Sequence, residues 1–331
     1  LIISLSTFLI LFFVLKKFNI LVDKRESSFH KKLVFFSGKP ILIGGIYILV
    51  LILISFPKDF LFLKLISFVI LLVGILSDID YLNSPLKRII IQCFLVIFFV
   101  LIENIFIRSL SIDFLDNLMK INIINLILTI FCFLVLINGT NFLDGLNGLV
   151  SGYYIIAISC ILFLADQDLI NLIYQKEILY LLVGLIIFFI FNIFGLTFLG
   201  DGGAYILALI VGFIFISNFN TNISISPYFI ALLFWYPAFE NLFSIIRRIY
   251  KKTNVSEPDN NHLHALLFKR ILKKNKKTYA NNIASIFILI CCLPGFILSN
   301  IYHNQSLILG IIISINISVY LTSFYLLRNE K

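Results

Sequence analysis

The sequence predicts an all-α, polytopic integral membrane protein. Of its 331 residues 60% are hydrophobic and only 13% are charged, and the mean hydropathy is +1.05. Water could not wet the surface of a soluble domain of this composition. The apolar residues also fall into runs close to the ~20 residues that a helix needs to cross a bilayer. We therefore predict a single transmembrane domain over residues 1–331 with about eleven spans.

The spans follow one another along the chain, with polar breaks between them. Each run is apolar enough to cross about 30 Å of hydrocarbon as a helix. The chain begins at Leu1 inside the first run, which we interpret as a trimmed or misassigned start. This run lacks the basic start and the small-residue cleavage site of a signal peptide, so we expect it to remain as a helix. The expected spans are 2–20, 41–56, 60–77, 89–107, 121–138, 149–165, 177–194, 204–217, 227–246, 283–301 and 306–327.

Lysine and arginine predict how these spans are oriented. Eleven crossings divide the loops between two faces, and 21 of the 26 basic residues fall on one face. The positive-inside rule makes that face cytoplasmic and places the N-terminus outside. The same rule accounts for the net charge of +9 without a nucleic acid partner. The predicted cytoplasmic loops are 21–40, 78–88, 138–148, 195–203 and 247–282.

Four acidic residues fall on this face, although only Lys and Arg were used to assign it. Asp78 and Asp80 follow the third span, Asp144 lies between the fifth and sixth, and Asp201 between the seventh and eighth. Charges at helix ends often do no more than anchor the helix at the membrane surface. Their placement alone is therefore compatible with a shared site and with simple anchoring. The sequences around the acids favour a site.

Two of these acids stand among glycines. "FLGDGGAYIL" at 198–207 places Asp201 before a helix, where backbone N–H groups favour anions. In "NGTNFLDGLNGL" at 138–149, Asn141, Asp144 and Asn147 are three apart and share one face of a helical turn. An Asn-Gly turn with capping asparagines is the alternative interpretation. Carboxylate and amide oxygens are also ligands that Mg²⁺ prefers, and Mg²⁺ is often completed by substrate phosphates.

Basic residues and histidines accompany the acids. Lys87 and Arg88 follow the first acidic loop, and Arg247 and Arg248 follow the ninth span. Together with the acids they suggest a site that handles a pyrophosphate. His262 and His264 could ligate zinc, but no further Cys or His lies near enough to complete that site. We favour phosphate or nucleotide binding for them, because imidazole donates to phosphate oxygen. The cysteines read as small core residues without a redox role; they are Cys93, Cys132, Cys160, Cys291 and Cys292.

Four stretches, in this order, resemble the polyprenyl-phosphate N-acetylhexosamine-1-phosphate transferases. This is glycosyltransferase family 4, with the WecA-like enzymes and phospho-MurNAc-pentapeptide translocase. The resemblance extends from "GKPILIGGIYI" at 38–48 to about residue 270. Its motifs are "GILSDIDYLNSPLKRIIIQ" at 74–92, "NGTNFLDGLNGL", "FNIFGLTFLGDGGA" at 191–204 and "PDNNHLHALL" at 258–267.

The resemblance implies a phosphotransferase of the bacterial inner (plasma) membrane, with its active site facing the cytoplasm. It would transfer an N-acetylhexosamine 1-phosphate, GlcNAc-1-phosphate foremost, from a UDP-sugar to undecaprenyl phosphate. UMP would be released, and the product would start a lipid-linked cell-envelope glycan. The implied cofactor is Mg²⁺, with Mn²⁺ as the expected substitute. A homodimer is compatible with the resemblance.

The resemblance also suggests a role for each candidate residue. Enzymes of this chemistry work chiefly by positioning and by neutralising charge. We expect catalytic acids at Asp78, Asp144 and Asp201, and Mg²⁺ ligands at Asp201 and Asn147. Substrate binding and hydrogen-bonding support of the loops are expected from Asn138, Asn141 and Asn192. Contacts with the substrate phosphates are expected from Arg88, Arg248, His262 and His264.

Three positions depart from the family pattern. Ser77 stands where many members have the first of two aspartates, so no carboxylate there can act as a base. Asn147 replaces a common second Asp, and Ala265 stands where WecA-like members often have another His. The first loss is tolerable, because a phosphate monoester is mostly dianionic at neutral pH and needs positioning more than deprotonation.

Three other functions remain open from the sequence. A transporter or flippase for a lipid-linked sugar would place an ionisable residue within a span. Glu240, near Pro237, is the acid expected inside one. A structural scaffold would depend on none of these polar residues. A catalytically inactive homologue is the narrower alternative, motivated by Ser77 and Ala265.

Overall fold

The computed structural model describes residues 1–22, 40–222, 224–252, 261–273 and 276–329. Within them the chain is almost entirely helical, as the composition predicts. The elements that lead to the first acidic loop and its partner helix are α1 (Ile2–Phe18), β1 (Ile41–Leu42), α2 (Gly44–Ser55), the short 3₁₀ turn η2 (Lys58–Phe60), α3 (Leu61–Asp78) and α4 (Pro85–Ile102).

The remaining helices complete the bundle around the other polar loops. They are α5 (Asp113–Met119), α6 (Asn122–Leu143), α7 (Leu149–Asp166), α8 (Gln175–Ile193), α9 (Gly200–Thr221), α10 (Pro227–Leu233), α11 (Trp235–Tyr250), α12 (Leu263–Leu272), α13 (Lys277–Ile301) and α14 (Ser306–Asn329), with strand β2 (Thr197–Phe198) before α9.

Eight of the helices in the described residues are long and apolar enough to cross a membrane, or nine if α10 and α11 form one broken span. The two are bent by 72° relative to each other. Every expected span has a helix or this bent pair in its place, but the count of eleven is not established. Helix α2, with 12 residues, is about 18 Å long at 1.5 Å per residue, shorter than the hydrocarbon layer. Helix α1 has 17 residues.

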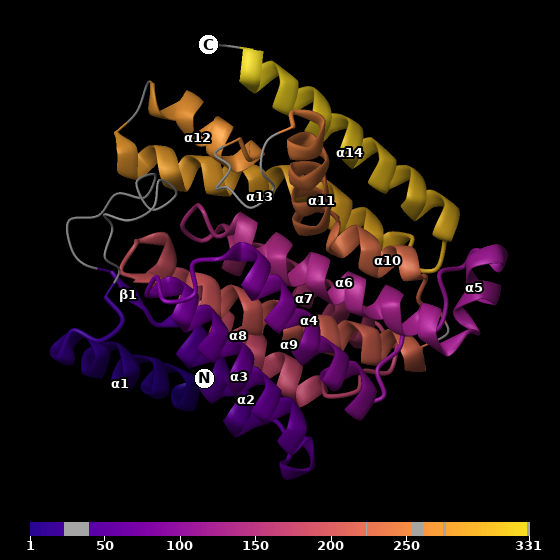
Figure 1. Ribbon diagram of the computed structural model, residues 1–331, viewed down its shortest axis with the longest axis horizontal. Helices are drawn as coiled ribbons and strands as arrows, with labels where there is room; N and C mark the ends of the chain where they lie inside the picture. Colours follow the sequence, from indigo (N-terminus) through magenta and orange to yellow (C-terminus); the bar gives the residue numbers. More distant parts are fainter. Residues whose placement is uncertain (23–39, 223, 253–260, 274–275, 330–331) are drawn as a thin grey trace.

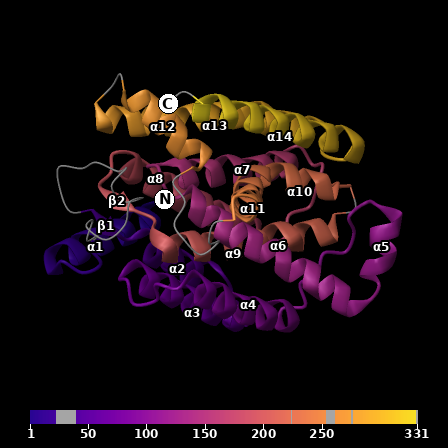
Figure 2. The ribbon, with the colours of Figure 1, turned by 45° about the horizontal axis from the view of Figure 1, so that its top comes forward.

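Helix α9 is the centre of the bundle. All of its residues from Gly202 to Ile216 are buried, which fits a sequence that is apolar on every side. It packs against α2, α3 and α6, most extensively against α3. Gly74 and Gly202 permit this approach, because a Cβ on Gly74 would lie 2.2 Å from the Gly202 Cα atom. In Figure 2, α9 lies between α3 and α4 on one side and the layer of α12, α13 and α14 on the other.

The polar loops gather at one end of this bundle. Strands β1 and β2 pair in parallel there, with Ile41 opposite Thr197 and Leu42 opposite Phe198. Leu42 also donates its N–H to the Leu21 carbonyl, at 2.9 Å. Helix α5 lies at the opposite end of the molecule (Figure 1). Backbone hydrogen bonds thus join the ends of the loops at 21–40 and 195–203. The basic residues assigned both loops to one face.

Candidate active site

The first turn of α9 is bound by two acids from other helices. Asp78, the last residue of α3, accepts hydrogen bonds from the backbone N–H groups of Asp201 at 3.0 Å and Gly202 at 3.3 Å. Asp144, just after α6, accepts from the Gly200 N–H at 3.1 Å. The first N–H groups of a helix have no partner within it and carry partial positive charge, so carboxylates are favoured there. Three stretches far apart in the sequence therefore meet at this terminus.

Gly200 is required for this arrangement. Its φ of +73° is in the left-handed region that side chains rarely adopt. A Cβ atom on it would lie 2.7 Å from Asp78 Oδ2. The first glycine of "GDGG" therefore provides both the turn and the space that lets Asp78 reach the backbone of α9.

Asp201 makes a different set of contacts from the other two acids. Its Oδ2 atom accepts from Ser77 Oγ at 2.5 Å and from Arg88 Nη1 at 2.9 Å. Arg88 Nη1 also donates to Ser77 Oγ at 2.6 Å. The side chains of Arg88 and Asp201 are 21% and 25% exposed, so this ion pair lies at the edge of the protein. Ser77, which departs from the family pattern, is therefore a direct partner of Asp201.

The asparagines of the 138–148 stretch are held by protein groups. Asn138 Nδ2 donates to Gln92 Oε1 at 3.0 Å and to the Leu134 carbonyl at 2.9 Å. Asn141 Nδ2 lies 3.5 Å from the Tyr205 hydroxyl of α9. The backbone N–H of Asn147 donates to Asn281 Oδ1 of α13 at 2.9 Å.

Asn192 connects two of the loops. Its Oδ1 atom accepts from the Gly148 N–H at 2.7 Å, and its Nδ2 atom donates to the Thr197 carbonyl at 2.8 Å. The side chain is 5% exposed. In this geometry Asn192 joins the 138–148 loop to β2, and its expected contact with substrate stays a prediction.

The two histidines lie against the same loop from the other side. His262 Nδ1 is 2.9 Å from Glu240 Oε1, and its ring lies 5.2 Å from that of Phe142. His264 lies against Gly145, where an added Cβ would be 2.7 Å from its Nε2 atom. The histidines are only 2% and 1% exposed. Their expected contact with substrate phosphates thus stays a prediction, and the contacts seen are with protein.

Arg248 joins this second group. It is buried at the end of α11, and its guanidinium lies 6.0 Å from the Phe142 ring centroid. The structure therefore brings Asp78, Asp144, Asp201 and Arg88 together at the start of α9. It places His262, His264 and Arg248 behind the 142–145 segment. Asp144 and Gly145, adjacent in sequence, connect the two groups.

The donor set suits a hard cation that the protein holds only in part. Among the described residues, no group of three or more His, Cys, Asp or Glu side chains is arranged to hold a metal ion. Mg²⁺ usually needs only one or two carboxylates, because waters and substrate phosphates complete its shell. Asp201 fits as one such ligand, since Ser77 and Arg88 both bind its Oδ2 atom and its side chain is partly exposed. Asn147 as a second ligand stays a prediction.

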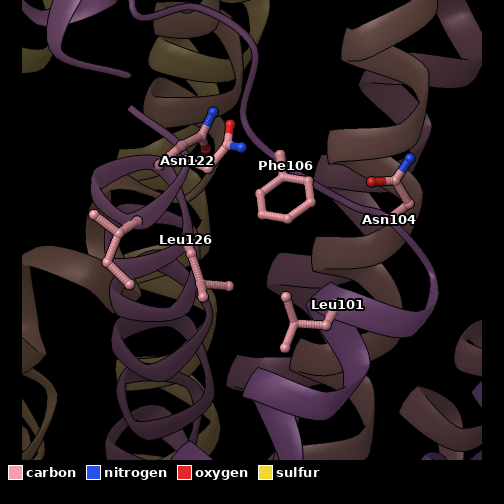
Figure 3. A pocket seen from close by; sticks show the side chains of 7 residues that line it. Leu101, Asn104, Phe106, Asn122 and Leu126 are labelled. Carbon is pink, nitrogen blue, oxygen red and sulfur yellow. The ribbon is translucent and has the colours of Figure 1, made fainter. Parts of the chain in front are cut away.

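A cavity of about 600 Å³ lies at the far ends of α4 and α6, away from this site. Its lining includes Leu101 and Asn104 on one side and Asn122 and Leu126 on the other, with Phe106 between them (Figure 3). Asn125, which also lines it, donates to the Ile107 carbonyl at 3.0 Å. Asn125 thus ties Ile107 to α6, and the cavity is separate from the acids.

Sequence reasoning missed several residues that support the site. Tyr320 of α14 donates to Glu240 Oε2 at 2.8 Å, and no local pattern in α14 indicates this. Tyr205 of α9, within a predicted span, and Asn281 of α13, at the end of the predicted 247–282 loop, likewise contact the 138–148 loop, and neither was among the expected site residues. Glu240, expected as an acid of the transport type, is instead bonded to His262 and Tyr320. The sequence signal that could have marked Glu240 as part of the site was an acid within an apolar run.

The fold and the site together define a multi-pass membrane protein with an acid-rich site at one end of its helices. Residues 60–218, just under half of the chain, match the family model of glycosyl transferase family 4, so the chain is similar to that family over this segment. The match covers α3 to α9 and includes every acid at the start of α9.

A curated protein of Bacillus subtilis (strain 168) is also similar to this chain. It is described as a probable undecaprenyl-phosphate N-acetylglucosaminyl 1-phosphate transferase. The two are 27% identical over 206 residues, which are 60% of this chain and 55% of the relative. The chain thus spans about half the length of the relative it matches.

Proposed function

We propose that this protein transfers an N-acetylhexosamine 1-phosphate, foremost GlcNAc-1-phosphate, from a UDP-sugar to undecaprenyl phosphate. The observation that carries the proposal is the convergence of Asp78, Asp144, Asp201 and Arg88 on the first turn of α9. The name of the Bacillus relative supports the choice of lipid and sugar. The product would start a cell-envelope glycan, and the site would face the cytoplasm of a bacterial inner membrane, where UDP-sugars are supplied.

In the proposed reaction an oxygen of the lipid phosphate attacks the β-phosphorus of the UDP-sugar. The bond from that phosphorus to the bridging oxygen breaks, and UMP leaves in line. Arg88 is close enough to Asp201 to bind a phosphate oxygen beside that carboxylate. Asp78 and Asp144 keep the helix terminus in place. Catalysis then rests on positioning and on charge neutralisation.

We propose Asp201 as the chief protein ligand of Mg²⁺, with Asn147 as the second and Mn²⁺ as a substitute. When bound, the ion would offset the charge that develops on the leaving UMP. Ser77 holds one oxygen of Asp201, so it assists by orienting this carboxylate and not as a base.

The test is UMP release by the purified full-length protein in detergent, with undecaprenyl phosphate and UDP-GlcNAc, with and without Mg²⁺. We expect release that needs both the lipid and the metal and is lost in Asp201→Ala. Asp113→Ala, at the start of α5 at the opposite end, is the matched control and should retain activity. If folded protein released no UMP from any of a panel of UDP-hexosamines, an inactive homologue or a transporter would replace this proposal.

A transporter is the second candidate, and its motivation is Glu240 within an apolar run. Both carboxylate oxygens of Glu240 are engaged by Tyr320 and His262, and the side chain is fully buried. Through these partners Glu240 is connected to the loop that carries Asp144. This favours a role for Glu240 in supporting the site over a role in transporting an ion.

A further inference from the structure

A buried carboxylate links the last helix to the candidate site. Glu240 of α11 is 0% exposed, and its two oxygens lie 2.8 Å from the Tyr320 hydroxyl of α14 and 2.9 Å from His262 Nδ1. A buried charge is tolerated only when it is well paired, so these two contacts set where each partner lies. Tyr320 itself is enclosed by Phe239 and Phe243, with ring centroids 5.0 and 5.7 Å away. The carboxylate is thus held in one place.

The bond to Glu240 also fixes the ring of His262. A histidine whose Nδ1 is bonded to a carboxylate has a defined ring plane and tautomer. The ring of His264 lies nearly parallel to it, with centroids 5.5 Å apart and an interplanar angle of 6°. Phe142 of α6 also packs against His262, with ring centroids 5.2 Å apart. Glu240 therefore fixes the position of the His262 ring, and through the contact between the two rings that of His264.

The second imidazole abuts the backbone next to Asp144. At Gly145 an added Cβ would lie 2.7 Å from His264 Nε2 and 3.2 Å from Cδ2. Asp144, one residue earlier, accepts from the Gly200 N–H at the start of α9. A displacement of His264 would therefore move or release the residue that holds the catalytic end of α9.

We propose that Tyr320, Glu240, His262 and His264 form a brace that sets the position of the 142–145 segment, and so of Asp144. In this arrangement the histidines are positioning residues and do not contact the substrate phosphates. Their burial, at 2% and 1% exposure, supports this. The kinetic part of the proposal rests on the proposed transferase function. The part that concerns the position of the loop does not.

The first test uses the contact between Gly145 and His264. Gly145→Ala is expected to lower kcat at least tenfold, because the added methyl group displaces His264. In the background of His264→Ala, which removes the colliding ring, the same change is expected to cost less than twofold. Such non-additivity is the mark of two residues that act through one contact. An equal cost of Gly145→Ala in both backgrounds would overturn the brace.

The second test uses a pair of tyrosines on α14. Tyr320→Phe removes the hydroxyl that binds Glu240, whereas Tyr325→Phe alters an exposed tyrosine on the same helix. We expect Tyr320→Phe to raise amide hydrogen exchange in residues 138–148 and to leave exchange in α5 unchanged, with no effect of Tyr325→Phe. We also expect it to lower kcat several-fold while KM for the UDP-sugar changes less than twofold.

Each outcome of the second test counts for or against the brace. Unchanged exchange in residues 138–148 would refute it. A rise in KM alone would also refute it, because this would mark the histidines as direct contacts of the nucleotide. If the wild-type protein released no UMP, the proposed function would fail, but the exchange measurement would still decide on the brace.

Discussion

At the residue scale, three aspartates of one site have two kinds of surroundings. Asp78 and Asp144 accept from backbone N–H groups of α9, so they act on the structure of the helix terminus. Asp201 is bonded to the side chains of Ser77 and Arg88. Removing any of these acids would thus impair the site, but through different physical causes.

Gly200→Ala should show the cost of the turn before α9. The methyl group requires a left-handed backbone and collides with Asp78 Oδ2. We expect a loss of about 1–2 kcal/mol from the backbone strain, and more from the collision. Thermal unfolding in detergent measures the loss, and UMP release should fall with it. A variant as stable and active as the wild type would contradict this reading of the motif.

Arg88→Gln should separate catalysis from stability. It removes the ion pair with Asp201, which is partly exposed and so contributes little to folding. If Arg88 binds a substrate phosphate, kcat should fall roughly 100- to 1,000-fold, as when one charge-stabilising donor is lost. Arg108→Gln, which loses a 3.1 Å bond to the Asn220 carbonyl at the opposite end, is the control and should keep its rate. Equal rates in the two variants would exclude this role for Arg88.

At the scale of elements, α9 is held at both ends by polar side chains. Its start is bound by the two carboxylates. Near its end, Asn218 accepts from the Ile173 N–H at 2.6 Å and Asn222 accepts from the Asn171 N–H at 2.9 Å. Asn218 Nδ2 also donates to the Ile173 carbonyl at 3.2 Å, and Asn222 Nδ2 donates to the Asn171 carbonyl at 2.9 Å. The central helix therefore cannot slide along its axis without breaking bonds at both ends.

Asn218→Ala should weaken the fold without affecting the chemistry. It leaves the partly buried backbone groups of Ile173 without their partner, at a cost of about 1–3 kcal/mol. We expect a lower unfolding temperature in detergent and an unchanged kcat per folded molecule, because the site is at the other end of α9. A fall in kcat without loss of stability would show that the two ends are coupled.

At the scale of the whole molecule, the loops assigned to one face by their basic residues do meet at one end. Hydrogen bonds join the 78–88 and 138–148 loops to the start of α9, and the histidine segment packs on the 138–148 loop. The contacts were not used to assign the face, so the agreement supports the placement of these loops on one shared face.

Thiol labelling in bacterial cells should decide the orientation. In a background with the native cysteines replaced by alanine, Asn117→Cys on α5 should react with an impermeant reagent in intact cells. Tyr250→Cys, at the end of α11 and 89% exposed, should react only after permeabilisation. The two positions lie at opposite ends of the bundle. The reverse pattern of labelling would place the site outside and would exclude UDP-sugars as its substrates.

The sequence alone determined the class of protein, the sites of its helices and the acids of the candidate site. These depend on local composition: apolar runs must be helical and buried in lipid, and basic residues set orientation. The glycines around Asp144 and Asp201 marked tight backbone for the same local reason. The bend between α10 and α11 and the shortness of α2 were missed, because apolar composition does not reveal where a helix stops.

Only the tertiary structure decided which groups are partners. Asp78 binds the backbone of Asp201 across 123 residues, and Tyr320 reaches Glu240 across 80. It also decided that His262 and His264 are buried against the segment that carries Asp144, while their expected contact with phosphates stays a prediction. The physical reason is that a polar side chain in an apolar bundle must find a partner, and packing of distant helices selects which one it meets.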